Sequence, residues 1–124
     1  MVTPDSVSSR FSITSACHDA ARLGACLPWK VVESDRPHGR VDFFVTIFDL
    51  GLGRDRRVED HLERATDALF RERDALERLE AECGYALWVQ LRSRAKEVVA
   101  AVPERIASRL AYLRVELQLR IDRP

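Results

Sequence analysis

Between Val58 and Cys83 the chain repeats apolar side chains at intervals of three and four residues, which places them on one side of an α-helix. On the other side an aspartate precedes an arginine by four residues three times in succession, as Asp60/Arg64, Asp67/Arg71 and Asp74/Arg78. Each such pair stabilises a helix by about 0.3–0.5 kcal/mol. The segment is therefore predicted to form one long helix whose charged side faces water.

Alternation of apolar and polar residues predicts the strands. The clearest strand covers residues 115–122, where Val115, Leu117, Leu119 and Ile121 are expected to face inward and the residues between them to face water. Residues 41–50 are apolar on both faces, which is typical of an interior strand. Weaker patterns predict strands at 10–14, 29–33 and 85–91, short helices at 14–23 and 103–113, and either state at 96–102.

This order of elements predicts an α+β fold. We expect a two-layer sandwich, in which a largely antiparallel, ferredoxin-like sheet carries one long helix and two shorter helices on one face. Residues 1–9 are polar and are expected to form a flexible tail, followed by a single domain over residues 10–124.

The long helix is expected to outrun its own sheet. Twenty-six helical residues would span about 39 Å, whereas a strand of seven residues spans about 23 Å. The helix must overhang, kink or lie on something else, and Glu72 interrupts its apolar stripe midway. The predicted partner interface lies around this interruption and comprises Leu69 and Leu76 of the stripe, Glu72, and Phe70, which lies about a quarter turn from the stripe.

Composition argues against several classes of function. The formal net charge is zero, so no overall field favours nucleic acid or an anionic membrane. The cysteines are three in number and form no CxxC pair, which argues against a disulfide framework and a zinc ribbon. The sequence shows no signal peptide and no long apolar run, so we expect a cytoplasmic protein. We also expect no cofactor and no metal.

The loop at residues 51–57 is the best candidate for a binding site. It joins a predicted buried strand to the start of a helix, where free N–H groups and the helix dipole favour an anion. Its arginines add forked donors for phosphate or carboxylate groups. The predicted anion site comprises Gly53, Arg54, Arg56 and Arg57, with His38 from the preceding turn. Alternatively, the loop is a simple connection with Asp55 as the helix cap, and His61 is a half-exposed helix residue.

The second half of the chain, from Arg56 to Asp122, resembles a bacterial family catalogued as domain of unknown function 4279. The residues that carry the resemblance are Val58–Leu62, Cys83–Val89, Pro103–Ile106 with Arg109 and Leu110, and Val115–Asp122. The resemblance implies a small α+β domain with no established catalytic residues. It also implies an accessory or immunity-type protein that binds and neutralises a toxin.

Two hypotheses about function follow. The first is a non-enzymatic module that binds another protein chain, a second copy of itself included. The second is a small enzyme or receptor that holds an anionic metabolite, bearing phosphate or carboxylate, at the loop of residues 51–57. A pocket that converges on the loop arginines would favour the second hypothesis.

Overall fold

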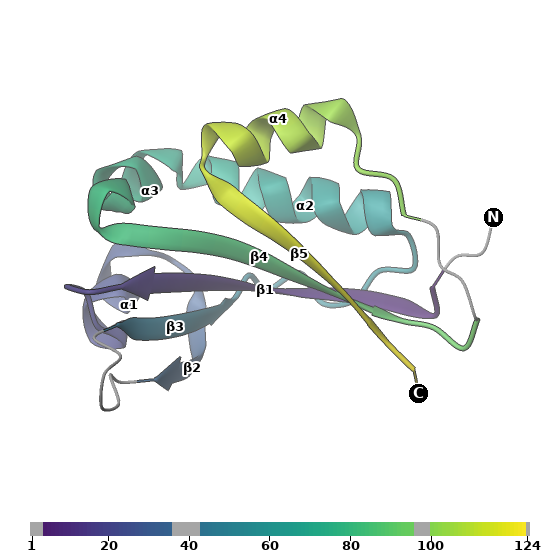
Figure 1. Cartoon of the computed structure of the whole chain (residues 1–124), viewed down its shortest axis with the longest axis horizontal. Helices are drawn as coiled ribbons and strands as arrows, with labels where there is room; N and C mark the ends of the chain where they lie inside the picture. The colour runs from purple at the N-terminus through teal and green to yellow at the C-terminus, as the bar shows by residue number, and fades with distance from the viewer. Residues whose placement is uncertain (1–3, 36–42, 96–99, 124) are drawn as a thin grey trace.

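Five strands form one mixed sheet, in the order β2-β3-β1-β4-β5, in the computed structural model, which describes residues 4–35, 43–95 and 100–123 (Figure 1). Neighbouring strands are antiparallel except β4 and β5, which run parallel. The predicted α+β class is confirmed, but the mixed sheet does not support the ferredoxin-like detail. The elements are β1 (Ser6–Ser15), α1 (Ala20–Cys26), β2 (Lys30–Asp35), β3 (Phe44–Asp49), α2 (Val58–Arg71), α3 (Arg73–Leu79), the 3₁₀ helix η1 (Glu80–Glu82), β4 (Cys83–Arg92), α4 (Glu104–Tyr112) and β5 (Val115–Asp122).

The helices α2, α3 and α4 lie over one face of the sheet (Figure 1). Beneath them Phe11, Phe48 and Leu87 are fully buried and share one face, because Phe11 pairs directly with the other two across the strands. Helix α1 packs on β2 and β3, and its Leu23 joins the same core. On β1, β4 and β5 the residues of the other face carry no helix from the described part of the chain. We call this the open face.

The predicted single long helix is divided at Glu72. Helix α2 ends at Arg71 and α3 starts at Arg73, while Glu72 has φ −101° and ψ 19°. The break allows the apolar residues on both sides of it to face the same sheet, and Leu69 and Leu76 are 0% and 1% exposed. Of the three possibilities left open by the sequence, namely overhang, kink or another support, the structure has a break, and it lies at Glu72, where the apolar stripe is interrupted. The stripe is covered from within the chain, so Leu69 and Leu76 are core residues and do not lie on an interface.

The amino-terminal strand is longer than its sequence pattern predicted. Residues up to 9 were expected to be a tail, yet β1 begins at Ser6 and lies in the middle of the sheet. Its serines look like loop residues in the sequence, but the hydroxyls of Ser9, Ser12 and Ser15 are bonded within the fold; Ser15, for example, donates to the carbonyl of Glu82 at 3.0 Å. The first helix consequently starts at Ala20, where the Asp19 side chain accepts a bond from the N–H of Arg22.

The apolar residues of the last strand, β5, are buried only in its first half. Val115 is buried and Leu117 is partly buried, but Leu119 and Ile121 are 46% and 53% exposed. Helix α4 leads directly into β5, so it covers only the first half of the strand, and the second half runs beyond the helix layer (Figure 1). The prediction that all four residues face inward is therefore wrong for Leu119 and Ile121.

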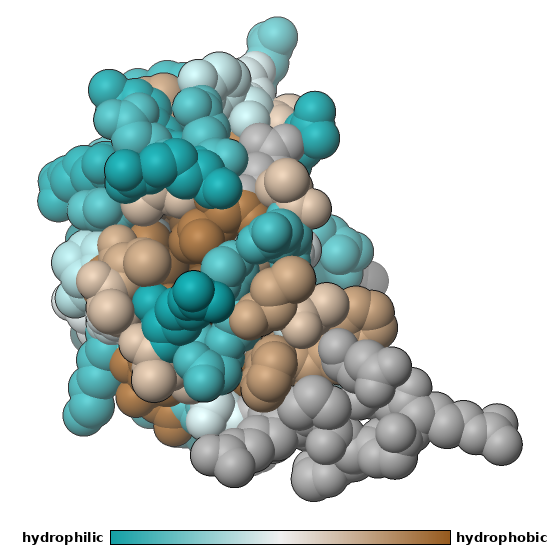
Figure 2. Space-filling view, turned by 90° about the vertical axis from the view of Figure 1, so that its left-hand side faces the viewer, coloured by the Kyte–Doolittle hydropathy of each residue, from teal (hydrophilic) through white to brown (hydrophobic). Residues whose placement is uncertain are grey.

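The remaining surface is mixed in character. Figure 2 looks at the end of the molecule where α1 and α3 lie, and shows apolar residues reaching the surface between polar ones.

The segment at residues 96–102, whose sequence fitted either a helix or a strand, falls partly outside the described residues, and residues 100–102 form neither. Among the residues described, no helix is both long enough and apolar enough to span a membrane.

Candidate functional site

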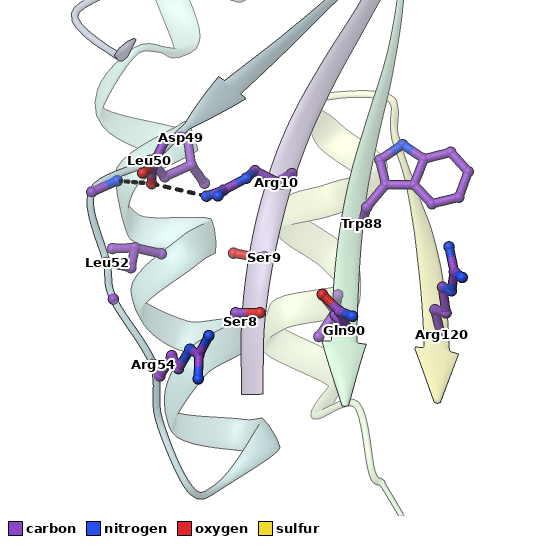
Figure 3. A pocket seen from close by; sticks show the side chains of 13 residues that line it. Ser8, Ser9, Arg10, Asp49, Leu50, Leu52, Arg54, Trp88, Gln90 and Arg120 are labelled. Atoms are coloured by element: carbon purple, nitrogen blue, oxygen red, sulfur yellow. Dashed lines mark hydrogen bonds and ion pairs between the residues drawn. The ribbon is translucent and has the colours of Figure 1, made fainter. Parts of the chain in front are cut away.

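A groove with a volume of about 580 Å³ lies on the open face, between β1 and the loop that follows β3 (Figure 3). Pairing of β1 with β3 ends at Phe11 and Phe48, and the chain meets β1 again only where Asp55 pairs with Val7. Between these points the loop bows away from the strand, helped by positive φ angles at Gly51 and Gly53. The groove is lined by Ser8, Ser9, Arg10, Asp49, Leu50, Gly51, Leu52, Gly53, Arg54, Trp88, Val89, Gln90 and Arg120.

Three arginines from three separate elements line this groove. Arg10 comes from β1, Arg54 from the loop and Arg120 from β5. The guanidinium of Arg10 lies 3.4 Å from a carboxylate oxygen of Asp49. Among the described residues of the lining, Asp49 is the only acidic one. Arg120 donates to the carboxylate of Asp122, which lies outside the lining, at 3.1 Å. Arg54 is exposed and makes no ion pair with another described residue, and Figure 3 shows its side chain directed from the loop toward β1. With Arg10 paired to Asp49 and Arg120 paired to Asp122, the groove keeps one unbalanced positive charge, that of Arg54, on a chain whose net charge is zero.

Strand β4 adds an aromatic surface beside the arginines. Trp88 is 47% exposed, and its indole N–H donates to the hydroxyl of Ser12 at 2.9 Å, which fixes the ring on the open face. Gln90 is two residues further along the same face, and its amide donates to the Asp122 carboxylate. Tryptophan and arginine are the residue types that most often dominate binding energy at protein interfaces.

The backbone of β1 is also open to the groove. Val7 exchanges two hydrogen bonds with Asp55, with N···O distances of 2.7 and 2.9 Å. Alternate residues of an antiparallel strand direct their N–H and C=O groups to the same side. The N–H and C=O of Ser9 therefore point toward the bowed loop, where the described residues provide no backbone partner. A bound molecule could satisfy these two groups.

Beneath the groove, His61 connects the loop, β1 and α2. The side chain is fully buried, with Nδ1 at 2.8 Å from the Asp55 carboxylate and Nε2 at 2.7 Å from the Ser9 hydroxyl. Arg64 donates to both oxygens of Asp55, at 3.0 and 2.8 Å, and to the carbonyl of Leu52 at 2.8 Å. These bonds fix the base of the loop, because each polar group buried there has a partner.

The positions of Asp55 and His61 correct two expectations. Asp55 does not cap α2, because Arg57 occupies the N-cap position and no side chain makes the capping bond. His61 is not half-exposed, since its ring lies between Asp55 and Ser9. The serine, histidine and aspartate have the contacts of a nucleophile, a base and an orienting carboxylate. Ser9 is only 8% exposed and Arg64 forms an ion pair with Asp55, and these two features favour a structural role over a catalytic one.

The predicted anion site is only partly assembled. Gly53 and Arg54 line the groove, but Arg56 and Arg57 do not. Both are exposed at the start of α2, and Arg57 lies 4.0 Å from Asp60. The first turn of α2 contains its own acidic residues, Glu59 and Asp60, which complement the positive end of the helix dipole. His38 lies outside the described residues.

Of the two α2 residues in the predicted partner interface, Leu69 is buried and Phe70 is partly exposed. Phe70 is half-buried under the Arg73 and Arg109 guanidinium groups, 4.9 and 5.3 Å from its ring centre, and lies 5.9 Å from the ring of Tyr112. The ring thus connects α2 with α3 and α4. Glu72 is the partly exposed residue at the break between α2 and α3.

The groove residues that were not predicted from the sequence include the four long side chains of Arg10, Trp88, Gln90 and Arg120. Alternation on each strand gives a signal for them, because they occupy the positions between the buried residues of β1 and β4 and the polar positions of β5. Alternation does not tell which strands are neighbours. The parallel pairing of β4 with β5 brings Arg120 beside Gln90.

No protein-family profile, no curated protein and no solved structure matches this chain. The resemblance to the family of unknown function therefore stays a prediction. In the ranges 4–35, 43–95 and 100–123 there is also no cluster of three or more histidine, cysteine, aspartate and glutamate side chains that could hold a metal.

Proposed function

We propose that this protein is a cytoplasmic, non-enzymatic binding module that recognises an acidic segment of another protein through the open face of its sheet. An accessory or immunity-type role, in which the bound protein is a toxin, is the form of this proposal that agrees with the family resemblance. The observation that carries the proposal is that Arg10, Arg54 and Arg120 line one groove, in which Arg54 has no ion-pair partner among the described residues while Arg10 and Arg120 are paired with Asp49 and Asp122.

Charge and shape both support an acidic protein segment as the partner. The positive groove complements carboxylate groups, and forked guanidinium donors bind carboxylates with two parallel hydrogen bonds. Trp88 provides exposed aromatic area next to the groove, as expected at a protein interface. The N–H and C=O of Ser9 are oriented to bond the backbone of an extended chain.

A glutamate-rich peptide of extended conformation is a suitable probe. Binding would be followed by tryptophan fluorescence, with Arg54→Ala as the test variant and Arg56→Ala as the matched control from the same loop. We expect Arg54→Ala to weaken binding by roughly tenfold because it removes a charge-assisted contact. The control removes the same charge outside the groove and should change affinity by less than about twofold.

Salt dependence and partner identity complete the test. Affinity for the peptide should fall as salt rises, since exposed charges are screened. Equal losses for Arg54→Ala and Arg56→Ala would show that net charge alone attracts the peptide, which would contradict the proposal. An immunity-type role predicts that the purified product of a neighbouring toxin gene binds the wild type and binds Arg54→Ala more weakly.

A second candidate is a small enzyme or receptor for an anionic metabolite. The groove volume, about 580 Å³, lies within the range of small-molecule sites. Ser9 lines the groove and contacts His61, which in turn contacts Asp55. Serine, histidine and aspartate are the residue types of a hydrolytic relay.

Two measurements distinguish this candidate from the protein-binding module. Phosphate-bearing metabolites should raise the melting temperature of the wild type but not that of Arg54→Ala. A fluorophosphonate probe should label the wild type and not Ser9→Ala if Ser9 acts as a nucleophile. Failure to label, together with no thermal shift, would eliminate the metabolite hypothesis without affecting the peptide experiment.

A further inference from the structure

The two edges of the sheet differ in how they are protected against pairing with another strand. At one edge, β2 has six residues, a register shift between Val31 and Glu33, and exposed charged side chains at Lys30 and Glu33. Short length, bulges and charges are the usual means by which an edge strand avoids pairing. These features make β2 a protected edge.

The opposite edge, β5, also carries charged residues, namely Glu116, Arg120 and Asp122, but it lacks the short length and the register shift of β2. It has eight residues without proline and pairs with β4 in eight consecutive steps with no register shift. Its outer side has no strand partner among the described residues. Leu119 and Ile121 are about half exposed there, on the same face as the buried Val89 and Leu91 with which they pair. The edge therefore offers both free backbone groups and apolar area.

We propose that β5 pairs antiparallel with β5 of a second copy of this chain, around a twofold axis at Gln118. In this register Glu116 of each copy lies opposite Arg120 of the other, so two pairs of opposite charge form on the open face. On the other face Leu117 lies opposite Leu119, and Val115 lies opposite Ile121. Directly opposite residues of this kind stabilise antiparallel strands.

Neighbouring registers are less favourable. Pairing must shift by two residues at a time to keep each face of the sheet continuous. A twofold axis at Leu119 would place Glu116 opposite Asp122, and an axis at Arg120 would place Arg120 opposite itself. Both arrangements bring like charges together, which is destabilising. Of the three registers compared, only the one centred on Gln118 places residues of opposite charge opposite each other.

The proposed dimer has a ten-stranded sheet, with the helices of both copies on one face and both grooves on the other. It goes beyond the proposed function and does not rest on it. In addition, Arg120 lies at the rim of the groove, so the dimer would place a carboxylate of the second copy beside each groove. Glu116 does not line the groove, which allows dimer formation to be tested separately from ligand binding.

A charge-exchange series provides the test, with the mass measured by light scattering after size exclusion over a range of concentrations. The wild type should reach twice the chain mass of 14.2 kDa. Glu116→Arg and Arg120→Glu should each weaken the dimer by at least roughly tenfold, because the symmetry converts two attractive pairs into two repulsive ones. The double variant Glu116→Arg/Arg120→Glu restores opposite charges and should recover the dimer.

Crosslinking tests the position of the axis. In a background with Cys17→Ser and Cys26→Ser, Gln118→Cys should form a disulfide-linked dimer, whereas Glu33→Cys on the β2 edge should not. Circular dichroism of every variant would show that the monomer remains folded. A wild type that stays at 14.2 kDa at the highest concentration, or a double variant that does not recover the dimer, would overturn the proposal. Equal crosslinking at positions 33 and 118 would also overturn it.

Discussion

The two faces of the sheet use similar residues for different purposes. On the covered face, His61, Asp55 and Arg64 form a network in which each group has a partner, and the histidine has no exposed area. On the open face, Arg54 has no ion-pair partner among the described residues, and Trp88 is 47% exposed. Polar groups with partners stabilise a fold, whereas groups left without partners at the surface are available to bind. This difference predicts different effects of mutation on the two faces.

The largest expected effect is loss of stability on the covered face. Leu69→Ala should lower the free energy of unfolding by about 3 kcal/mol, since it leaves a cavity under α2. Leu119→Ala, the same substitution at an exposed position of β5, should cost less than about 1 kcal/mol in dilute protein. Urea denaturation measures both. Equal costs would mean that the two leucines have similar environments, contrary to their exposures of 0% and 46%.

His61→Ala should have the next largest effect, about 2–4 kcal/mol, because it leaves Asp55 and Ser9 without their buried partner. His18→Ala is the matched control. Its Nε2 lies 2.6 Å from Glu82, but that carboxylate is half exposed, so its loss should cost below about 1 kcal/mol. Thermal and urea unfolding of both variants would test this order. A smaller cost for His61→Ala would show that the network does not stabilise the fold.

Trp88→Ala should have a moderate effect on stability and a larger one on binding. Removal of the half-exposed ring and its bond to Ser12 should cost about 1 kcal/mol in the free energy of unfolding. If the open face binds a partner, the same change should weaken peptide binding by roughly tenfold or more. Stability is measured by urea denaturation and binding by isothermal calorimetry. A variant that loses stability but binds normally would place the ring outside the interface.

The smallest expected effect concerns the cysteines. Burial is the main cause that raises the pKa of the Cys83 thiol above its model-peptide value, while Cys17 and Cys26 are exposed. Fewer thiolates form at a given pH when the pKa is raised, so iodoacetamide should modify Cys17 and Cys26 first. The protonated thiol is favoured in the fold, so its contribution to stability should decline as pH rises through 9.0 and above. Mass spectrometry of the labelled peptides gives the order of reaction.

Sequence patterns alone predicted the α+β class, a helix that begins at Val58, an interruption of its apolar stripe at Glu72 and the positions of β4 and β5 to within two residues. These features follow from local periodicity and from the length of a helix compared with a strand. The sequence also indicated Gly53 and Arg54 as part of a site, because glycine and arginine occur together in one loop.

Which strands are neighbours became evident only in the folded chain. Local patterns carry no information on strand order, so the convergence of Arg10, Arg54 and Arg120 and the contact of His61 with Ser9 were not predicted. Strand order also placed β1 at the centre of the sheet and β5 at its edge. For the same reason the apolar side of β5 is buried at Val115 and exposed at Ile121: the helix layer ends before the strand does.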